Sequence, residues 1–278
     1  MTLVATGELV GAARAAGGAS VAFNVIGIEH AEAIVAGAEV AGRPVILQIS
    51  ENCVSYHGAV EPIAAAALAV AAASAVPVAV HLDHATSVGL VSAAVTAGIE
   101  SVMFDASELD YASNVAATAE IARWCHDRGV WVEAELGEVG GKDGVHAPGA
   151  RTKPAQAADY VRTTGVDGLA VAVGSSHAML TKSARLDLEL VGQIRAEVSV
   201  PLVLHGSSGV PENVLIAAVR SGLTKINIAT ALNKVFTESV RAALAGDERL
   251  VDPRKYMAAG RDAVAEEVAR LLTVLASP

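Results

Sequence analysis

Short runs of apolar residues recur along the chain, and each is followed by an alanine-rich segment whose apolar positions have helical spacing. The starts of these runs lie about 20 to 40 residues apart, the length of one strand–helix unit. Glycine or proline commonly stands directly before a run, as expected where a helix ends and a loop begins. The pattern predicts eight strands over residues 20–25, 44–50, 77–83, 100–105, 130–136, 168–174, 201–206 and 224–229.

Eight such units in about 250 residues favour an α/β fold of the (β/α)8 TIM-barrel type over a doubly wound sheet, which shows the same alternation. The polar residues decide between the two folds, because nearly every predicted strand ends in one. A barrel gathers all strand ends around a single mouth, whereas an open sheet spreads them along an edge. The strand-end residues are Asn24, Gln48, Ser50, Asp83, His84, Asp105, Glu135, His177, His205 and Asn227.

No linker or break in composition divides the chain, so residues 1–278 are expected to form one barrel domain with a C-terminal helical extension. A long connection from Gly137 to Pro154 is glycine-rich and charged, which is typical of a mobile active-site loop. The tail from Asp247 onwards contains an amphipathic helix over residues 260–275, a candidate oligomer contact.

Composition narrows the class of protein. Hydrophobic residues make up 53% of the chain, and the net charge of -10 argues against a nucleic-acid partner, since such a surface repels phosphodiester backbones. Cys53 and Cys125 form neither a disulfide framework nor a CxxC pair, which favours the cytoplasm.

The mean hydropathy of +0.45 raises the question of a membrane segment. The longest stretch without a charged residue, 62–80, is mostly alanine and contains Pro77. We interpret it as a short buried helix, a turn over 74–76 and a strand from Pro77. The N-terminus carries Glu8 and no basic segment, so we expect no signal peptide and no membrane association.

Three histidines stand at predicted strand ends: His84, His177 and His205. Three imidazoles converging at a barrel mouth, with one position open, are typical of a catalytic zinc site, although cobalt or manganese also accepts such ligands. His81 shares a strand face with Asp83 and is expected deeper in the barrel, behind the ligands. A lone histidine is more often structural, and that role is assigned to His30, His57, His126 and His146.

Carboxylates accompany these histidines. Asp83 directly precedes His84, and adjacent residues at a strand end can diverge, so that one binds metal while the other faces the substrate as an acid or base. Alternatively, Asp83 only orients an imidazole. Asp105 and Glu135 are expected behind the metal ligands or at an alternative metal position.

Small polar residues follow the last two strands. Gly206, Ser207 and Ser208 come after the seventh strand, and Asn227 to Thr230, including Ala229, end the eighth and open a helix. Barrels often bind phosphate there through backbone N–H groups and a helix N-terminus. Asn24 and Ser50, at the ends of the first two strands, are expected to contact the same substrate.

The segments AVHLDHA, SVMFDAS, EAELGEVGGKD, AVAVGSSHA, VLHGSSG and KINIAT, in this order, resemble the class II (zinc-dependent) ketose-bisphosphate aldolases over residues 20 to 270. The resemblance implies that His84, His177 and His205 hold one catalytic zinc ion and that Asp83 is the acid/base at the C4 oxygen of the substrate. It also implies that residues 206–208 and 227–230 bind the dihydroxyacetone-phosphate half. A monovalent cation near the phosphate is a further expectation, and Arg261 corresponds to an arginine that reaches the distal phosphate in a neighbouring subunit.

The sequence departs from the family pattern at several positions. Asp143, in GGKDG, replaces the loop glutamate that is the family's proposed base for the carbon-bound proton. Ala178 replaces a glycine after the second zinc histidine, and Asn52 and Cys53 stand where small residues are usual. These positions bear on the identity of the substrate.

By resemblance, the expected function is reversible aldol cleavage of a ketose 1,6-bisphosphate, of fructose or tagatose type, by a homodimer or homotetramer. Alternatives are a different phosphorylated keto-sugar or keto-acid substrate, and a silent relative that only binds sugar phosphate. A Schiff-base aldolase using Lys225, which points into the predicted barrel, and a zinc hydrolase are two further alternatives.

Overall fold

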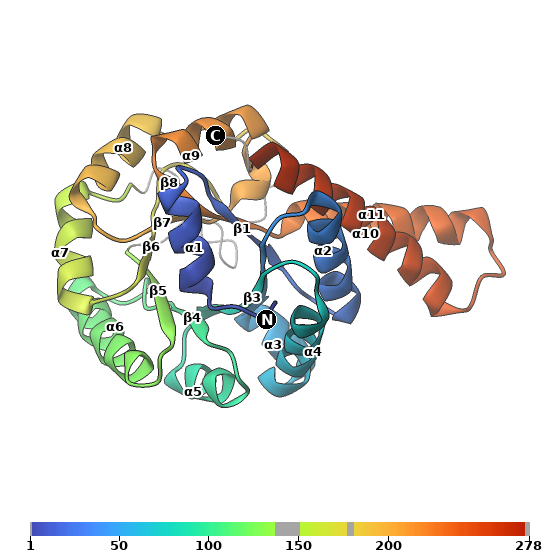
Figure 1. Cartoon of the computed structure of the whole chain (residues 1–278), viewed down its shortest axis with the longest axis horizontal. Coiled ribbons are helices and arrows are strands. Elements are labelled where there is room, and N and C mark those ends of the chain that lie inside the picture. The colour runs from blue at the N-terminus through green and yellow to red at the C-terminus, as the bar shows by residue number, and fades with distance from the viewer. Residues whose placement is uncertain (1, 137–150, 177–180, 276–278) are drawn as a thin grey trace.

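Eight parallel strands close into a barrel in chain order, β1 to β8, in a computed structural model that describes residues 2–136, 151–176 and 181–275. Figure 1 looks into this barrel and shows the helices around it. The predicted TIM-barrel class is therefore confirmed over the doubly wound sheet. The strands are β1 Ser20–Asn24, β2 Val45–Ser50, β3 Val78–Ala85, β4 Ser101–Phe104, β5 Trp131–Glu135, β6 Gly168–Ala170, β7 Leu202–Leu204 and β8 Leu223–Ile228.

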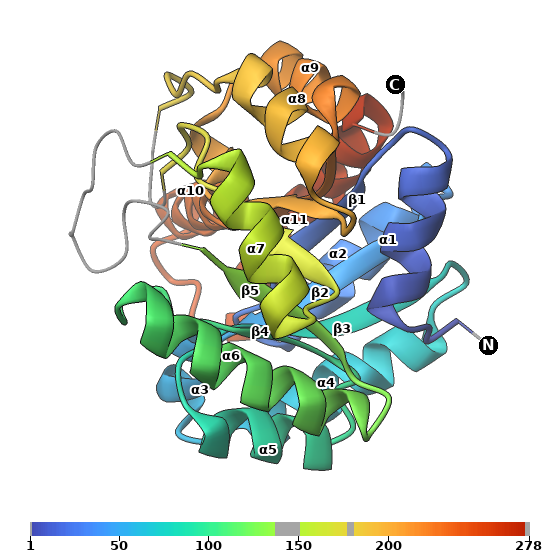
Figure 2. The ribbon, with the colours of Figure 1, turned by 90° about the vertical axis from the view of Figure 1, so that its left-hand side faces the viewer.

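The helices follow the strands in the order that the sequence predicts. Figure 2 shows α6 and α7 packed along the outside of the sheet. A short 3-10 helix, η1 Ser207–Gly209, follows β7. The α-helices are α1 Thr6–Ala15, α2 Ile28–Ala41, α3 Glu51–His57, α4 Val60–Ala73, α5 Val88–Thr96, α6 Tyr111–His126, α7 Pro154–Thr164, α8 Leu188–Glu197, α9 Glu212–Ser221, α10 Thr230–Gly246 and α11 Pro253–Leu275.

Side chains alternate along each strand between the outer face, which meets the helices, and the interior of the barrel. Outward residues such as Phe23 and Leu82 pack against the helices in the main apolar core. Inward residues near the start of β1 to β3 are small or apolar, and Leu9 and Val10 of α1 pack against them. Helix α1 therefore covers the N-terminal end of the barrel, which leaves the mouth at the carboxyl ends of the strands.

Some strand boundaries differ from the prediction. The sixth strand was expected to reach residue 174, but β6 ends at Ala170. Beyond it, Ala172 exchanges hydrogen bonds with Thr152 at 2.9 and 3.0 Å, so the chain pairs there with a loop. Strand β3 is longer than expected and includes His84 and Ala85.

The charge-free stretch folds as predicted, with α4 ending at Ala73 and β3 beginning at Val78. In the described part of the chain, no single helix is long and apolar enough to cross a membrane. Helices α3 and α4 meet that criterion only as a pair, by length and composition, and the chain bends by 112° between them.

The C-terminal extension is a pair of long helices. Figure 1 shows α10 and the start of α11 reaching beyond the barrel as a hairpin, while the rest of α11 returns against α2. The predicted helix over 260–275 is thus the second half of α11, which begins at Pro253. The returning part packs closely, since a Cβ at Gly37 would lie 2.5 Å from the backbone oxygen of Ala265.

Candidate active site

A cavity of about 1010 Å³ opens at the carboxyl ends of the strands. Residues from β1, β2, β3, β4 and β8, and from the loops that follow these strands and β7, form much of its wall. The strand ends thus meet at one mouth, as the sequence predicts. The predicted site residues in the wall are Asn24, Ser50, Asp83, His84, Asp105, His205, Gly206, Ser207, Ser208, Asn227, Ala229 and Thr230.

The backbone at the end of β3 lets two adjacent side chains face the cavity. His84 has a φ of 53°, in the left-handed region that non-glycine residues rarely adopt. The register between β3 and β4 shifts between Leu82 and Ala85, around this residue. Asp83 and His84 both line the cavity as a result, with Asp83 Oδ2 3.9 Å from His84 Nε2. Such backbone strain is common at functional sites.

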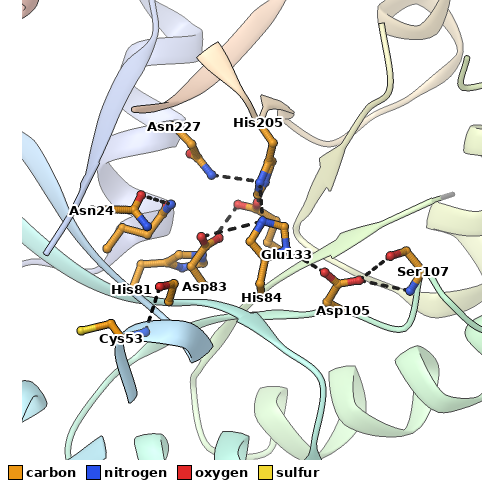
Figure 3. Close-up of polar contacts among 12 residues, drawn as sticks. Asn24, Cys53, His81, Asp83, His84, Asp105, Ser107, Glu133, His205 and Asn227 are labelled. Carbon is orange, nitrogen blue, oxygen red and sulfur yellow. Dashed lines mark hydrogen bonds and ion pairs between the residues drawn. The ribbon is translucent and has the colours of Figure 1, made fainter. Parts of the chain in front are cut away.

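A carboxylate fixes the orientation of the His84 ring. Asp105 Oδ2 lies 2.6 Å from His84 Nδ1, and its other oxygen accepts hydrogen bonds from the backbone N–H and the hydroxyl of Ser107. Because an ionised carboxylate only accepts, the proton of the neutral ring belongs on Nδ1. The lone pair of His84 is then on Nε2, which points toward His205 (Figure 3).

His205 is held in the complementary way. Its Nε2 lies 2.9 Å from Glu133 Oε1, and its Nδ1 lies 2.9 Å from His84 Nε2. With the ring protons directed to Asp105 and Glu133, two lone pairs face each other across this short distance. That arrangement is repulsive unless a cation is shared between the two nitrogens.

The same residues fit a divalent metal ion. Ligand atoms of Asp83, His84 and His205 all lie within 4.8 Å of one another, and so do those of His84, Asp105 and Glu135. Imidazole nitrogens whose other N–H is bonded to a carboxylate are the usual ligands of zinc and similar metals. The third predicted ligand, His177, lies outside the described residues, as do Asp143, His146 and Ala178.

Two loops form the predicted phosphate side of the cavity. Gly206 has a φ of 67°, and a Cβ there would lie 2.5 Å from the backbone oxygen of Ser176, so only glycine fits. Ser208 Oγ accepts a hydrogen bond of 3.2 Å from the N–H of Ala231, in the first turn of α10. The loop after β7 is thereby tied to the helix that begins at Thr230. The wall beside it is made of small residues and a helix N-terminus, which suit an anion.

The positions where the second strand's loop departs from the family pattern also line the cavity. Asn52 and Cys53 are part of its wall, together with Glu51, Tyr56 and Glu108, which the sequence analysis did not single out. Burial raises the pKa of the Cys53 thiol to about 11. Cys53 is therefore a poor nucleophile at neutral pH.

Other predicted residues lie apart from the cavity wall. Glu135 is fully buried behind His84 and Asp105. Arg261 is on α11, where it contacts Glu32 at 3.3 Å and Asp262 at 3.6 Å, and it is not part of the cavity wall of its own chain.

His81 lies beneath the site, as the sequence predicts, and so does Lys225; both are fully buried. Lys225 Nζ pairs with Glu133 Oε2 at 2.8 Å, which does not suit a Schiff-base lysine that must meet a carbonyl group in the cavity. Burial, and next the charge of Lys225, lower the pKa of His81 well below its usual value, so His81 is neutral.

Glu133 is the main site residue that the sequence analysis missed. The signal was present, because Glu133 and Glu135 are two residues apart in β5 and so share a face of the sheet. Glu135 drew attention because it ends the strand, whereas Glu133 lies one layer deeper, where it contacts His205.

Comparisons with known proteins place the chain among aldolases. A family model described as fructose-bisphosphate aldolase class-II matches residues 4–278. The crystal structure of the YdjI aldolase from Escherichia coli K12 is 32% identical, covers 98% of this chain and 97% of its own, and superposes with a TM-score of 0.86. A protein from Coccidioides immitis, described as a fructose-1,6-bisphosphate aldolase, is 27% identical over 96% of both chains, with a TM-score of 0.84.

The fold also matches a more distant structure. The fructose-bisphosphate aldolase of Campylobacter jejuni is 22% identical, covers 98% of this chain and 95% of its own, and has a TM-score of 0.83. At this level of identity the likeness shows the barrel fold.

Proposed function

The chain belongs to the class II fructose-bisphosphate aldolase family and is a metal-dependent aldolase, and on this basis we propose that it cleaves a ketose 1,6-bisphosphate reversibly. The products are dihydroxyacetone phosphate and an aldehyde such as glyceraldehyde 3-phosphate. The observation that carries the proposal is the pair of facing nitrogens, His84 Nε2 and His205 Nδ1, 2.9 Å apart beside Asp83.

The proposed metal ligands are His84, His177 and His205, and zinc is the proposed ion. A divalent metal held there would supply Lewis-acid stabilisation of the negative charge that develops as the C3–C4 bond breaks. The chain keeps the two described ligands in place through two carboxylates. Asp105 accepts a hydrogen bond from the N–H of the His84 ring, and Glu133 accepts one from the N–H of the His205 ring. We propose a supporting position for Glu135 as well.

Asp83 is the proposed acid/base. Its side chain lines the cavity and is nearly fully buried, with Oδ2 beside the ligand His84. A carboxylate at this place is suited to take the proton of the C4 hydroxyl during cleavage and to return it during synthesis. Asp143 is the proposed group for the carbon-bound proton, by its position in the GGKDG segment alone.

The rest of the cavity is proposed to orient the substrate. Gly206, Ser207 and Ser208, with residues 227–230, form the side proposed for the phosphate of the dihydroxyacetone half, and a monovalent cation is an additional proposed ligand there. Asn24 and Ser50 lie on the wall formed by β1 and β2 and are proposed to contact the sugar hydroxyls.

We propose that the chain acts as a homodimer or homotetramer in the cytoplasm. Two features support an assembly: the α10–α11 hairpin extends beyond the barrel, and Leu244 and Val251 are exposed on it. Arg261 lies outside its own cavity, which is consistent with a role in the distal phosphate site of a neighbouring subunit. Cys53 and Cys125 are both free thiols, which supports a reducing compartment.

The experiment is cleavage of fructose 1,6-bisphosphate and of tagatose 1,6-bisphosphate, each with and without EDTA, with dihydroxyacetone phosphate as the readout. We expect cleavage of one of the two, loss of activity with EDTA, and recovery with zinc. Release of inorganic phosphate instead would indicate a hydrolase. If the protein binds zinc but cleaves neither sugar, the 1,6-bisphosphate assignment is wrong, and a different keto-sugar substrate or a silent binding protein replaces it.

A further inference from the structure

A layer of polar side chains fills the barrel directly beneath the metal ligands. It consists of Gln48 on β2, His81 on β3, Glu133 on β5 and Lys225 on β8, and none of these residues is more than 1% exposed. Burying a charged pair is costly unless each charge is matched and hydrogen-bonded. The proposed mechanism uses none of these residues for contact with the substrate, so this polar layer calls for another role.

Glu133 is the centre of the polar layer. One carboxylate oxygen lies 2.9 Å from His205 Nε2, and the other lies 2.8 Å from Lys225 Nζ. Lys225 also donates to Gln48 Oε1 at 3.2 Å, and His81 Nε2 lies 3.9 Å from Glu133 Oε2. Each oxygen of Glu133 therefore has its own partner, and the ammonium group balances the charge.

We infer that Glu133, held by Lys225, is a positioning residue that fixes the tautomer of His205 and so leaves His205 Nδ1 available to the metal. The inference rests on the metal site of the proposed function. The carboxylate of the ion pair only accepts hydrogen bonds, so the proton of the neutral imidazole stays on Nε2. The lone pair is then on Nδ1, the atom that faces His84 Nε2.

Asn227, the other close neighbour of His205 Nε2, does not fix the tautomer of the ring. Asn227 Nδ2 lies 3.2 Å from that nitrogen, but a side-chain amide can present either its oxygen or its nitrogen. Lys225 does fix the group that faces it, because an ammonium group can only donate hydrogen bonds. It requires an oxygen at the position of Glu133 Oε2, whatever residue supplies it.

Because Lys225 can only donate whereas an amide can turn, the substitution Glu133→Gln tests the inference. In Glu133→Gln, the ammonium of Lys225 takes the amide oxygen, so the amide N–H groups face His205 Nε2. That nitrogen must then accept, and the ring proton moves to Nδ1, which blocks the metal. We expect affinity for zinc or cobalt to fall by about 10- to 100-fold, the usual effect of removing a partner of a ligand histidine.

A second variant separates the tautomer from a general loss of structure. In the double variant Glu133→Gln with Lys225→Met, the ammonium is gone, the amide can turn, and its oxygen can again accept from His205 Nε2–H. Metal affinity should therefore recover by about tenfold relative to Glu133→Gln alone, toward the affinity of the unchanged protein. Ser101→Ala is the control, because it removes the 2.6 Å contact to His81 Nδ1 without touching His205, and its metal affinity should be unchanged.

Two measurements decide the matter, both without sugar substrate. Chelator competition gives the metal affinity, and 15N chemical shifts of the His205 ring in the metal-free protein report which nitrogen carries the proton. We expect a proton on Nε2 in the unchanged protein, also where Nδ1 shares a second proton with His84 Nε2 in the absence of metal. In Glu133→Gln we expect the proton on Nδ1 and none on Nε2. An unprotonated Nε2 in the unchanged protein overturns the inference without any variant. It is also overturned if the double variant binds metal no better than Glu133→Gln while both remain folded.

The failure of the proposed function has a different signature. If the unchanged protein binds no metal, the proposed function fails, whereas the 15N shifts still report whether Glu133 sets the tautomer. If the protein binds metal and cleaves sugars but His205 carries its proton on Nδ1, only the positioning role fails.

Discussion

At the scale of single residues, the site depends on which nitrogen of each imidazole carries a proton. The His84 and His205 rings each direct one nitrogen to a carboxylate and the other to the shared space between them. The sequence shows the histidines and Asp105, because they stand at strand ends. It does not show that Glu133 reaches His205, because that contact depends on the depth at which β5 and β7 face each other.

The positive φ of His84 is also beyond sequence reasoning. The pair Asp83–His84 indicates only that two adjacent side chains are used together. Strict alternation in a strand would place one of them on the outer face. The left-handed backbone and the register shift beside it bring both to the cavity, and these are properties of the folded barrel.

Asp83 provides the prediction at this scale. Asp83→Asn keeps the size of the side chain but removes its ability to take a proton, so turnover should fall by about 10²- to 10⁴-fold. Metal affinity should stay within a few-fold, because His84 and His205 keep their carboxylate partners. Steady-state kinetics and chelator competition measure the two effects. Loss of metal comparable to that in His205→Ala would instead make Asp83 a ligand, since its carboxylate belongs to the same cluster.

At the scale of elements, the hydrophobic pattern is a strong predictor and the strand ends are a weaker one. Eight apolar runs match eight strands because each run is buried between the helices and the barrel interior. Strand β6 ends earlier than predicted, because the apolar residues Val171 and Val173 that follow it are buried outside the regular ladder. Strand β7 ends at Leu204, directly before the polar His205 and Gly206 that line the cavity. A run of apolar residues predicts that the segment is buried, but it does not predict where the strand pairing stops.

The attachment of α11 to the barrel gives the prediction at this scale. Glu212, the first residue of α9, accepts hydrogen bonds from Arg270 of α11 at 2.9 and 3.0 Å and from Lys182 at 2.7 Å. The hydrogen bonds from Arg270, and next from Lys182, lower the pKa of Glu212 to about 2. The folded state thus holds this proton less tightly than the unfolded chain. The stabilisation is complete above the unfolded pKa near 4.5 and is lost as the pH falls toward 2.

Glu212→Gln should therefore lower the free energy of unfolding at pH 7 by about 1 kcal/mol, a small value because the ion pair is partly exposed to solvent. The difference between variant and unchanged protein should shrink as the pH falls from 4.5 toward 2. Urea unfolding at several pH values measures it. Glu248→Gln, on the exposed turn after α10, is the control and should have no effect. A difference that grows at low pH would contradict this assignment.

At the scale of the whole molecule, the barrel separates stability from chemistry. Helix α1 and the apolar residues beneath it cover one end, and the cavity occupies the other. The interior between them is the polar layer. Sequence reasoning reaches the barrel and its mouth from a single chain. It does not reach the proposed role of Arg261 in the distal phosphate site, because that role needs a second copy of the chain. Within its own chain, Arg261 contacts Glu32.

The central claim is that metal and protein together activate dihydroxyacetone phosphate at this mouth, and deuterium exchange tests it most directly. The metal-loaded protein is incubated with dihydroxyacetone phosphate alone in D₂O, and NMR follows the hydrogens of the carbon that bears the free hydroxyl. The test needs no aldehyde, so it does not depend on which ketose is the substrate. We predict that one of these hydrogens exchanges, that EDTA stops the exchange and that zinc restores it. Binding of dihydroxyacetone phosphate to the zinc-loaded protein without any exchange would contradict the account.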